Sequence, residues 1–248
     1  MNLTLQNSVI TLVTVLLIAI AGFLLGAVLT SVGIGILSVF GVDVFEQSVL
    51  LIVINVLALQ GLGFGSVALF YLLTRNEGMD LLMVSIPDFR DLLAIISGLV
   101  SLFVVLVGVQ IVQTAFGIQS ADHGLVERGM QNPELLLILV PLSILLVGPG
   151  EELLFRGVIQ QLLRIRFGTI IGITIASVIF SIAHVGSLSG EGLFPTLITY
   201  VLLSVILGVS YEYSENLVVP SMIHGLFNAV QFIIIYLVVT SESQILII

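Results

Sequence analysis

Long apolar runs, separated by short polar segments, dominate the pattern of this 248-residue chain. Most of these runs exceed the roughly 20 residues that a helix needs to cross the hydrocarbon core of a bilayer. They lack the period-two alternation that marks a membrane β-strand. Because backbone groups in hydrocarbon must pair within their own segment, the pattern predicts an all-α transmembrane bundle. The uncharged runs cover 1–42, 47–74, 92–121, 135–150, 167–190, 192–211 and 216–241.

The runs predict a polytopic bundle of seven to eight spans. The count is open because 9–40 is long for one helix, and because Gly148-Pro149-Gly150 can break or restart the fourth. No soluble domain or linker interrupts the series, so we expect one integral membrane domain over 1–248. Its motif-bearing core covers about 133–240. The expected helices lie at about 9–33, 47–74, 92–118, 133–166, 169–184, 192–210 and 216–240.

Composition supports a membrane location and excludes several kinds of chemistry. Only 8% of the residues are charged, against roughly 25% in soluble domains. The chain has no cysteine, which excludes disulfides, thiolate nucleophiles and cysteine-bound metals. Fifteen acidic residues outnumber six arginines, so we expect no basic surface for nucleic acid.

The arginines predict the orientation of the chain in the cell membrane. The N-terminal segment lacks the basic region of a cleavable signal, so we expect the first run to be retained. With seven crossings, Arg128 lies on the side opposite the N-terminus, and four other arginines lie on the N-terminal side. Cytoplasmic loops are enriched in basic residues, so we expect a cytoplasmic N-terminus. The four are Arg75, Arg90, Arg164 and Arg166.

Three ionisable residues, Glu151, Glu152 and Arg156, stand inside the fourth expected helix, 133–166, which is otherwise mostly apolar. An ionisable group at the centre of a bilayer costs roughly 2.5–3.5 kcal/mol, so such groups pair or face a cavity. Glu152 and Arg156 are four residues apart, which predicts an ion pair on one helix face. Glu151 is turned away by about 100° and is left free. The alternative is a purely structural ion pair between helices.

Two histidines, His184 and His224, also lie in or beside apolar runs, and Asn228 shares a helix face with the second. Together with Glu151, they supply the parts for activating water and stabilising an oxyanion. The third histidine, His123, stands beside an acid in a polar loop, where we expect a solvated surface side chain.

Three motifs occur in order along the second half of the chain. They are Glu-Glu-x-x-x-Arg at 151–156, Phe-x-x-x-His at 180–184 and His-x-x-x-Asn at 224–228. Over about 147–231, the chain resembles the CAAX protease and bacteriocin-processing (CPBP or Abi) family of intramembrane proteases, which includes the type II CAAX prenyl endopeptidases. The N-terminal half carries no such motif.

The resemblance implies hydrolysis of a peptide bond in or beside the lipid bilayer. The substrate would be a membrane-anchored protein or peptide, prenylated in the CAAX-processing members. By the same resemblance, Glu151 and His184 would activate the attacking water, whereas His224 and Asn228 would stabilise the oxyanion. Glu152 with its arginine would position the first group.

A metal is the open alternative within this interpretation. Glu151, His184 and His224 would suit a catalytic zinc ion with an open position. However, the chain has no His-Glu-x-x-His motif, and the amide of Asn228 is a better oxyanion donor than zinc ligand. We therefore expect glutamate-activated water without an obligatory metal.

Two other functions would use similar residues. Buried carboxylates and histidines relay protons in transporters, and a member of the same fold could act as a non-catalytic scaffold or immunity protein. Straight helices would also keep the two motif histidines apart. At 1.5 Å per residue, His184 lies about 27 Å from the side of Arg166, and His224 about 10 Å. Catalysis therefore requires strong tilt, or a segment 212–219 that dips into the bundle.

Overall fold

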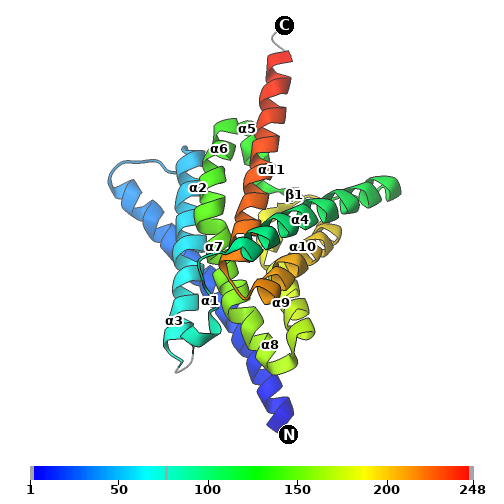
Figure 1. The fold of residues 1–248 in the computed structure, drawn as a ribbon. Coiled ribbons are helices and arrows are strands. Elements are labelled where there is room, and N and C mark those ends of the chain that lie inside the picture. The colour runs from blue at the N-terminus through cyan, green and yellow to red at the C-terminus, as the bar shows by residue number, and fades with distance from the viewer. Residues whose placement is uncertain (1–2, 76–77, 246–248) are drawn as a thin grey trace.

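The computed structural model describes residues 3–75 and 78–245, which are almost entirely helical (Figure 1). Seven helices in this part of the chain are long and apolar enough to cross a membrane, which confirms the predicted polytopic bundle. The chain is therefore a multi-pass membrane protein. The seven spans are Leu5–Val39, Ser48–Leu73, Phe89–Phe116, Pro133–Phe167, Thr169–Ser187, Leu193–Ser214 and Val218–Ser241.

Five of the spans each consist mainly of one long helix. Each of the other two consists of several consecutive helical segments. The second is α2 (Ser48–Val56), η1 (Leu57–Phe64) and α3 (Gly65–Leu73). The fourth is α6 (Pro133–Leu142), η3 (Ser143–Val147), α7 (Gly148–Glu152), η4 (Leu153–Gln160) and α8 (Gln161–Phe167). The single helices are α1 (Leu3–Val39), α4 (Phe89–Phe116), α9 (Thr169–Ala183), α10 (Leu193–Ser214) and α11 (Val218–Ile245).

Short elements connect the spans. The third and fourth are joined through β1 (Asp122–His123) and α5 (Gly124–Gln131). The fifth and sixth are joined through η5 (Val185–Ser187) and β2 (Leu188–Ser189), and η2 (Met79–Leu81) precedes α4. The two strands pair in antiparallel fashion, with His123 opposite Leu188.

The Gly148-Pro149-Gly150 sequence does not break the fourth span. The helix continues through it, with π-helical turns η3 before and η4 after. A Cβ on Gly148 would meet the backbone of Ser221 and Gly225 in α11, and one on Gly150 would meet the backbone of Gln60 in η1. The two glycines therefore allow three spans to pack closely, and Glu151 lies within a span whose helical segments follow one another without a break.

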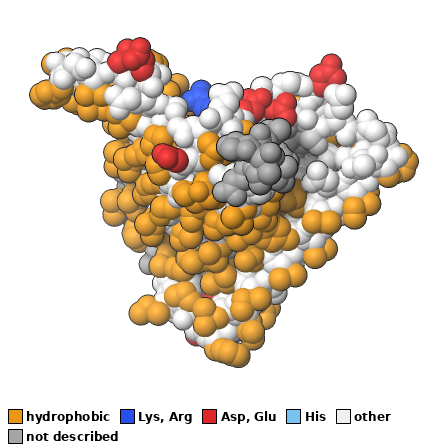
Figure 2. All heavy atoms as spheres, turned by 90° about the horizontal axis from the view of Figure 1, so that it is seen from above, with side chains coloured by type: hydrophobic (Ala, Val, Ile, Leu, Met, Phe, Trp, Pro, Cys, Tyr) orange, Lys and Arg blue, Asp and Glu red, His pale blue; other side chains and the backbone are white. Residues whose placement is uncertain are grey.

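Three apolar clusters of described residues hold the bundle together. One joins the first, second, fourth and fifth spans around Phe64, Leu154 and Phe155. The second joins α4, α10 and α11 around Leu102 and Ile223, and the third joins α2 and α6 around Ile52 and Leu139. Much of the outer surface is also apolar, and Figure 2 shows a broad hydrophobic face bordered by a polar rim. An apolar outer surface of this kind is expected for a protein that contacts the lipid tails of a bilayer. Side chains more than half exposed include Leu17, Leu24, Phe70, Ile111 and Ile170.

The turn between α10 and α11 lies inside the protein. Asn216 is buried, donates to Oδ2 of Asp91 (2.8 Å) and accepts from the backbone N–H of Ser85 (3.2 Å). The N–H of Leu217 donates to the carbonyl of Met83 (2.7 Å). In Figure 1, α4 and α10 run strongly inclined to α11, which begins beside α7. The two spans that flank this turn are thus inclined to each other, and the turn is anchored in the interior at Asn216 and Leu217.

Candidate active site

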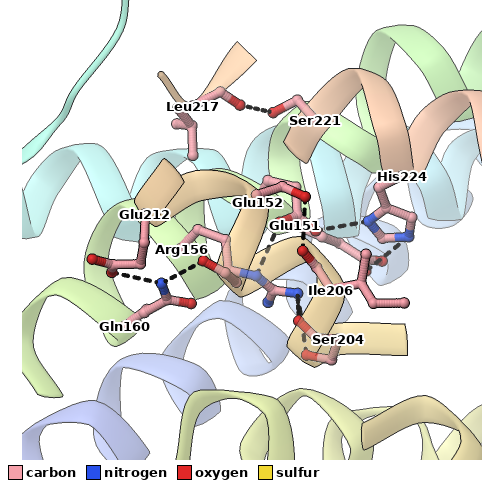
Figure 3. Close-up of polar contacts among 12 residues, drawn as sticks. Glu151, Glu152, Arg156, Gln160, Ser204, Ile206, Glu212, Leu217, Ser221 and His224 are labelled. Carbon is pink, nitrogen blue, oxygen red and sulfur yellow. Dashed lines mark hydrogen bonds and ion pairs between the residues drawn. The ribbon is translucent and has the colours of Figure 1, made fainter. Parts of the chain in front are cut away.

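Glu152 is the central buried carboxylate, and it has two partners. Its Oε2 lies 3.1 Å from Nε of Arg156, within the same helix, and both side chains are fully buried. Its Oε1 lies 2.8 Å from Nδ1 of His224, on α11 (Figure 3). The predicted ion pair is therefore present, and it extends to a histidine 72 residues away.

Arg156 is fixed by further contacts on the other side. It donates to the carbonyl and the hydroxyl of Ser204, at 3.2 and 3.1 Å, and its guanidinium lies 5.0 Å from the centre of the Phe180 ring. The Phe180 ring also packs on the imidazoles of His184 and His224, at 4.4 and 5.8 Å between ring centres. The contacts of Arg156 and Phe180 thus hold together the helices that carry the candidate residues.

The two imidazoles are oriented by bonds to their Nδ1 atoms. Nδ1 of His184 lies 2.8 Å from the carbonyl of Phe180, an acceptor only, so this nitrogen carries the proton. Nδ1 of His224 donates to the Glu152 carboxylate in the same way. Such bonds fix the tautomer and leave Nε2 for the functional contact. Both Nε2 atoms turn toward Glu151.

Glu151 lies where the two imidazoles converge. Its Oε2 is 3.7 Å from Nε2 of His184 and 4.0 Å from Nε2 of His224. Both distances are too long for a direct hydrogen bond, and Oε2 has no hydrogen-bond partner among the described residues. The first distance allows one water molecule to bond the carboxylate and the imidazole together.

These residues line one cavity of about 720 Å³, together with Asn228. The structure therefore brings Glu151, His184, His224 and Asn228 to one place, as the catalytic interpretation requires. Much of the wall is apolar, with residues from α4, α10 and α11 on one side and from α2 and α6 on another. The segments 123–128 and 186–189 complete the lining.

Comparisons with known proteins agree with the motifs. Residues 133–230 match the family described as type II CAAX prenyl endopeptidase Rce1-like. A curated Bacillus subtilis (strain 168) protein, "Uncharacterized protein YpbD", is 32% identical over 143 residues, which are 58% of this chain and 69% of that protein. The chain belongs to the Rce1-like CPBP family. At the level of the family, it is a CAAX-type intramembrane protease that acts on a peptide substrate in the bilayer. No solved structure matches the chain.

The alternative of a zinc ion on Glu151, His184 and His224 was left open by the sequence. Among the described residues, no three His, Asp or Glu side chains are placed to hold a metal ion. His224 directs its Nδ1 to Glu152 and its Nε2 toward Glu151. We therefore assign no step of the reaction to a metal.

The expectation for His123 was wrong. This Rce1-like chain holds the side chain half-buried in the cavity wall instead of in solvent. Burial, followed by the nearby His184, lowers the pKa of His123 to about 4. The position depends on pairing between β1 and β2, which are 65 residues apart, counting from 123 to 188. No pattern in the sequence around His123 predicts this pairing.

Polar residues of α10 were also missed, although a signal was available. Positions 196, 200, 204, 208 and 212 form a stripe with period four in an apolar helix. Tyr200 packs against His184 at 5.3 Å between ring centres and lines the cavity. Ser204 bonds Arg156, and Glu212 bonds Gln160 (2.9 Å). The C-terminal part of this stripe faces the fourth span, where Ser204, the carbonyl of Gly208 and Glu212 bond Arg156 and Gln160.

Proposed function

We propose that the chain is an endopeptidase that cleaves a membrane-anchored protein or peptide with water activated by Glu151 and His184. The observation that carries this proposal is the approach of Oε2 of Glu151 and two Nε2 atoms at one end of the cavity. The single membrane domain of residues 1–248 would contain its catalytic core at about 133–240. The N-terminal half would add walls of the substrate cavity.

In the first step, one water molecule donates its two hydrogens to Glu151 and to Nε2 of His184. Both groups are acceptors, since Nδ1 of His184 carries the ring proton. The oxygen lone pair then faces the carbonyl carbon of the substrate. Glu151 takes one proton as the hydroxide attacks, which forms the C–O bond and places negative charge on the carbonyl oxygen.

The second step needs donors for that oxygen and a proton for the leaving amine. Asn228 lines the cavity and supplies amide N–H groups. His224, when protonated on both nitrogens, donates Nδ1–H to Glu152 and Nε2–H to the oxyanion. The proton held by Glu151 then passes to the amine nitrogen as the C–N bond breaks, which leaves a carboxylic acid and an amine. The proton that remains on the acid passes to Nε2 of His184 and from there to solvent, so the final products are a carboxylate and an amine.

The deciding experiment compares the wild-type protein with the Glu151→Gln variant in liposomes. The probe is a pool of N-palmitoylated decapeptides of mixed sequence, analysed for products by mass spectrometry. We expect cleavage by the wild type and a loss of about 10²–10⁴ in rate for Glu151→Gln. The matched control is Glu134→Gln, which makes the same change on an exposed carboxylate. Wild-type rates in the Glu151 variant, or no cleavage by any protein, would reject the proposal.

The proposal also includes the orientation of the chain across the membrane. With seven spans, the lining segments 123–128 and 186–189 lie at the end opposite Arg75, Arg90, Arg164 and Arg166. If the arginines are cytoplasmic, the cavity is reached from outside. The chain has no cysteine, so the single variants Ser85→Cys and Ser189→Cys report the two sides. A membrane-impermeant maleimide added to intact cells should label only the second, and the reverse pattern would overturn this orientation.

A further inference from the structure

The segment 122–131, here called the cap, covers part of the cavity and lies outside the residues that match the family. It consists of β1 and α5. Three of its apolar or small residues, Gly124, Leu125 and Val126, line the cavity, and so do His123, Glu127 and Arg128. Glu127 and Arg128 are exposed, whereas His123 is a half-buried polar side chain that no motif of the chain accounts for.

The imidazole of His123 is held in one tautomer by the cap itself. Its Nδ1 accepts a hydrogen bond from the backbone N–H of Leu125 (3.3 Å), at the start of α5. Because Nδ1 is the acceptor, the proton of the neutral ring lies on Nε2. With its pKa at about 4, the ring is neutral near pH 7. Nε2–H is therefore a neutral hydrogen-bond donor, and no described residue accepts from it.

The cap is tied to the rest of the candidate site. His123 stands opposite Leu188 in the β1–β2 pair, and Ser187 just before it donates to the carbonyl of His184 (2.8 Å). On the other side, the N–H of Ala121 donates to Oγ1 of Thr196 (2.8 Å), one turn before Tyr200 on α10. His123 is thus fixed relative to His184 by contacts on both sides.

A peptide entering this cavity needs such a donor. Each backbone carbonyl that leaves water without a partner costs about 1–3 kcal/mol. Much of the neighbouring wall is apolar, including Leu125, Val126 and Leu188. A neutral N–H suits a peptide carbonyl, since it forms a bond without introducing a charge.

We infer that His123 is a substrate-positioning residue, whose Nε2–H binds a backbone carbonyl of the peptide and holds the scissile bond over Glu151. This inference rests on the proposed peptidase function. The carbonyl belongs to a residue beside the scissile bond, because the oxyanion itself is placed at His224 and Asn228. The competing role is structural, in which His123 only caps α5 through Nδ1.

Two amide variants separate these roles. His123→Asn places its oxygen near the position of Nδ1, where it keeps the cap of α5, and lacks the distant donor. His123→Gln places an N–H near the position of Nε2 and keeps the donor. If His123 positions the substrate, kcat/KM should fall about ten- to hundredfold in the His123→Asn variant and stay near the wild-type value in the His123→Gln variant. A structural role predicts the opposite order, with loss of thermal stability in the Gln variant.

The probe is the decapeptide of the pool that the wild type cleaves fastest, and its ketomethylene analogue is used in parallel for binding. The inference is supported if the His123→Asn variant binds the analogue about tenfold more weakly than the wild type, while the His123→Gln variant binds it about as well. The inference is overturned if the His123→Asn variant binds and cleaves like the wild type, or if the two variants are impaired equally. The Glu151→Gln protein serves as the reference: if it cleaves normally, the proposed mechanism fails, whatever the His123 variants show. Should no peptide be cleaved, binding of the pool itself gives the same comparison.

Discussion

Nε2 of His184 lies 3.7 Å from Oε2 of Glu151, and the ring is fixed there by the bond between Nδ1 and the carbonyl of Phe180 (2.8 Å). His184→Gln removes an acceptor of the attacking water but retains a polar group near it. We expect turnover to fall by about 10²–10⁴. Thermal unfolding should change little, because the bond to Phe180 lies within one helical turn. Initial cleavage rates and unfolding curves check this, and an unchanged rate would remove His184 from the mechanism.

Glu152 should matter for stability as well as activity. Glu152→Gln leaves the fully buried Arg156 without its charged partner, and breaking a buried pair costs about 3–5 kcal/mol. We expect a large fall in the unfolding temperature. The double variant Glu152→Gln with Arg156→Met removes the orphaned charge and should regain much of the stability without regaining activity. If the single variant unfolds like the wild type, the ion pair is not a structural support.

Asn228 tests the oxyanion site. Asn228→Ala should reduce kcat by about 10²–10³, since it removes a donor that acts mainly in the transition state. Binding of the ketomethylene analogue should stay near the wild-type value. The neighbouring substitution Gln231→Ala, also in the cavity lining, provides a matched loss of an amide. Equal effects of the two substitutions would argue against a specific role for Asn228.

Metal removal distinguishes two ways of activating water. The arrangement of Glu151, His184 and His224 does not provide a three-ligand metal site. We therefore expect a chelator, followed by dialysis, to leave most of the activity. Complete inactivation that zinc reverses in stoichiometric amount would show that the water is activated by a metal, while the peptidase assignment would stand.

The spans and the motif residues could be predicted because both produce local patterns. Apolar length gives the spans, and the i, i+4 spacing of Glu152 and Arg156 gives their pair. The meeting of His184 and His224 could not be derived from spacing. It depends on tertiary contacts such as the bond between Asn216 and Asp91, which are 125 residues apart, and on the inclination of α4 and α10 to α11 (Figure 1).

The open question of a break in the fourth span and the error at His123 have a similar cause. Gly148 and Gly150 look like a break when the segment is considered alone, but they are contacts for Ser221 and Gln60 on other helices. His123 looks like a surface residue because its own neighbours are polar, whereas Leu188, its partner in the strand pair, lies far along the chain. In each case the deciding contact is tertiary.

The two bonds of Glu152 also imply an order of assembly. The pair with Arg156 lies within one helix, so it forms as soon as that span is made and lowers the cost of placing two charges in the membrane. The bond to His224 needs α11, which is synthesised after the fourth span. Until that helix docks, Glu151 faces only one imidazole and lacks Asn228. The proposed hydrolytic centre is therefore completed only once α11 has docked, so a chain that has made the fourth span but not α11 lacks it.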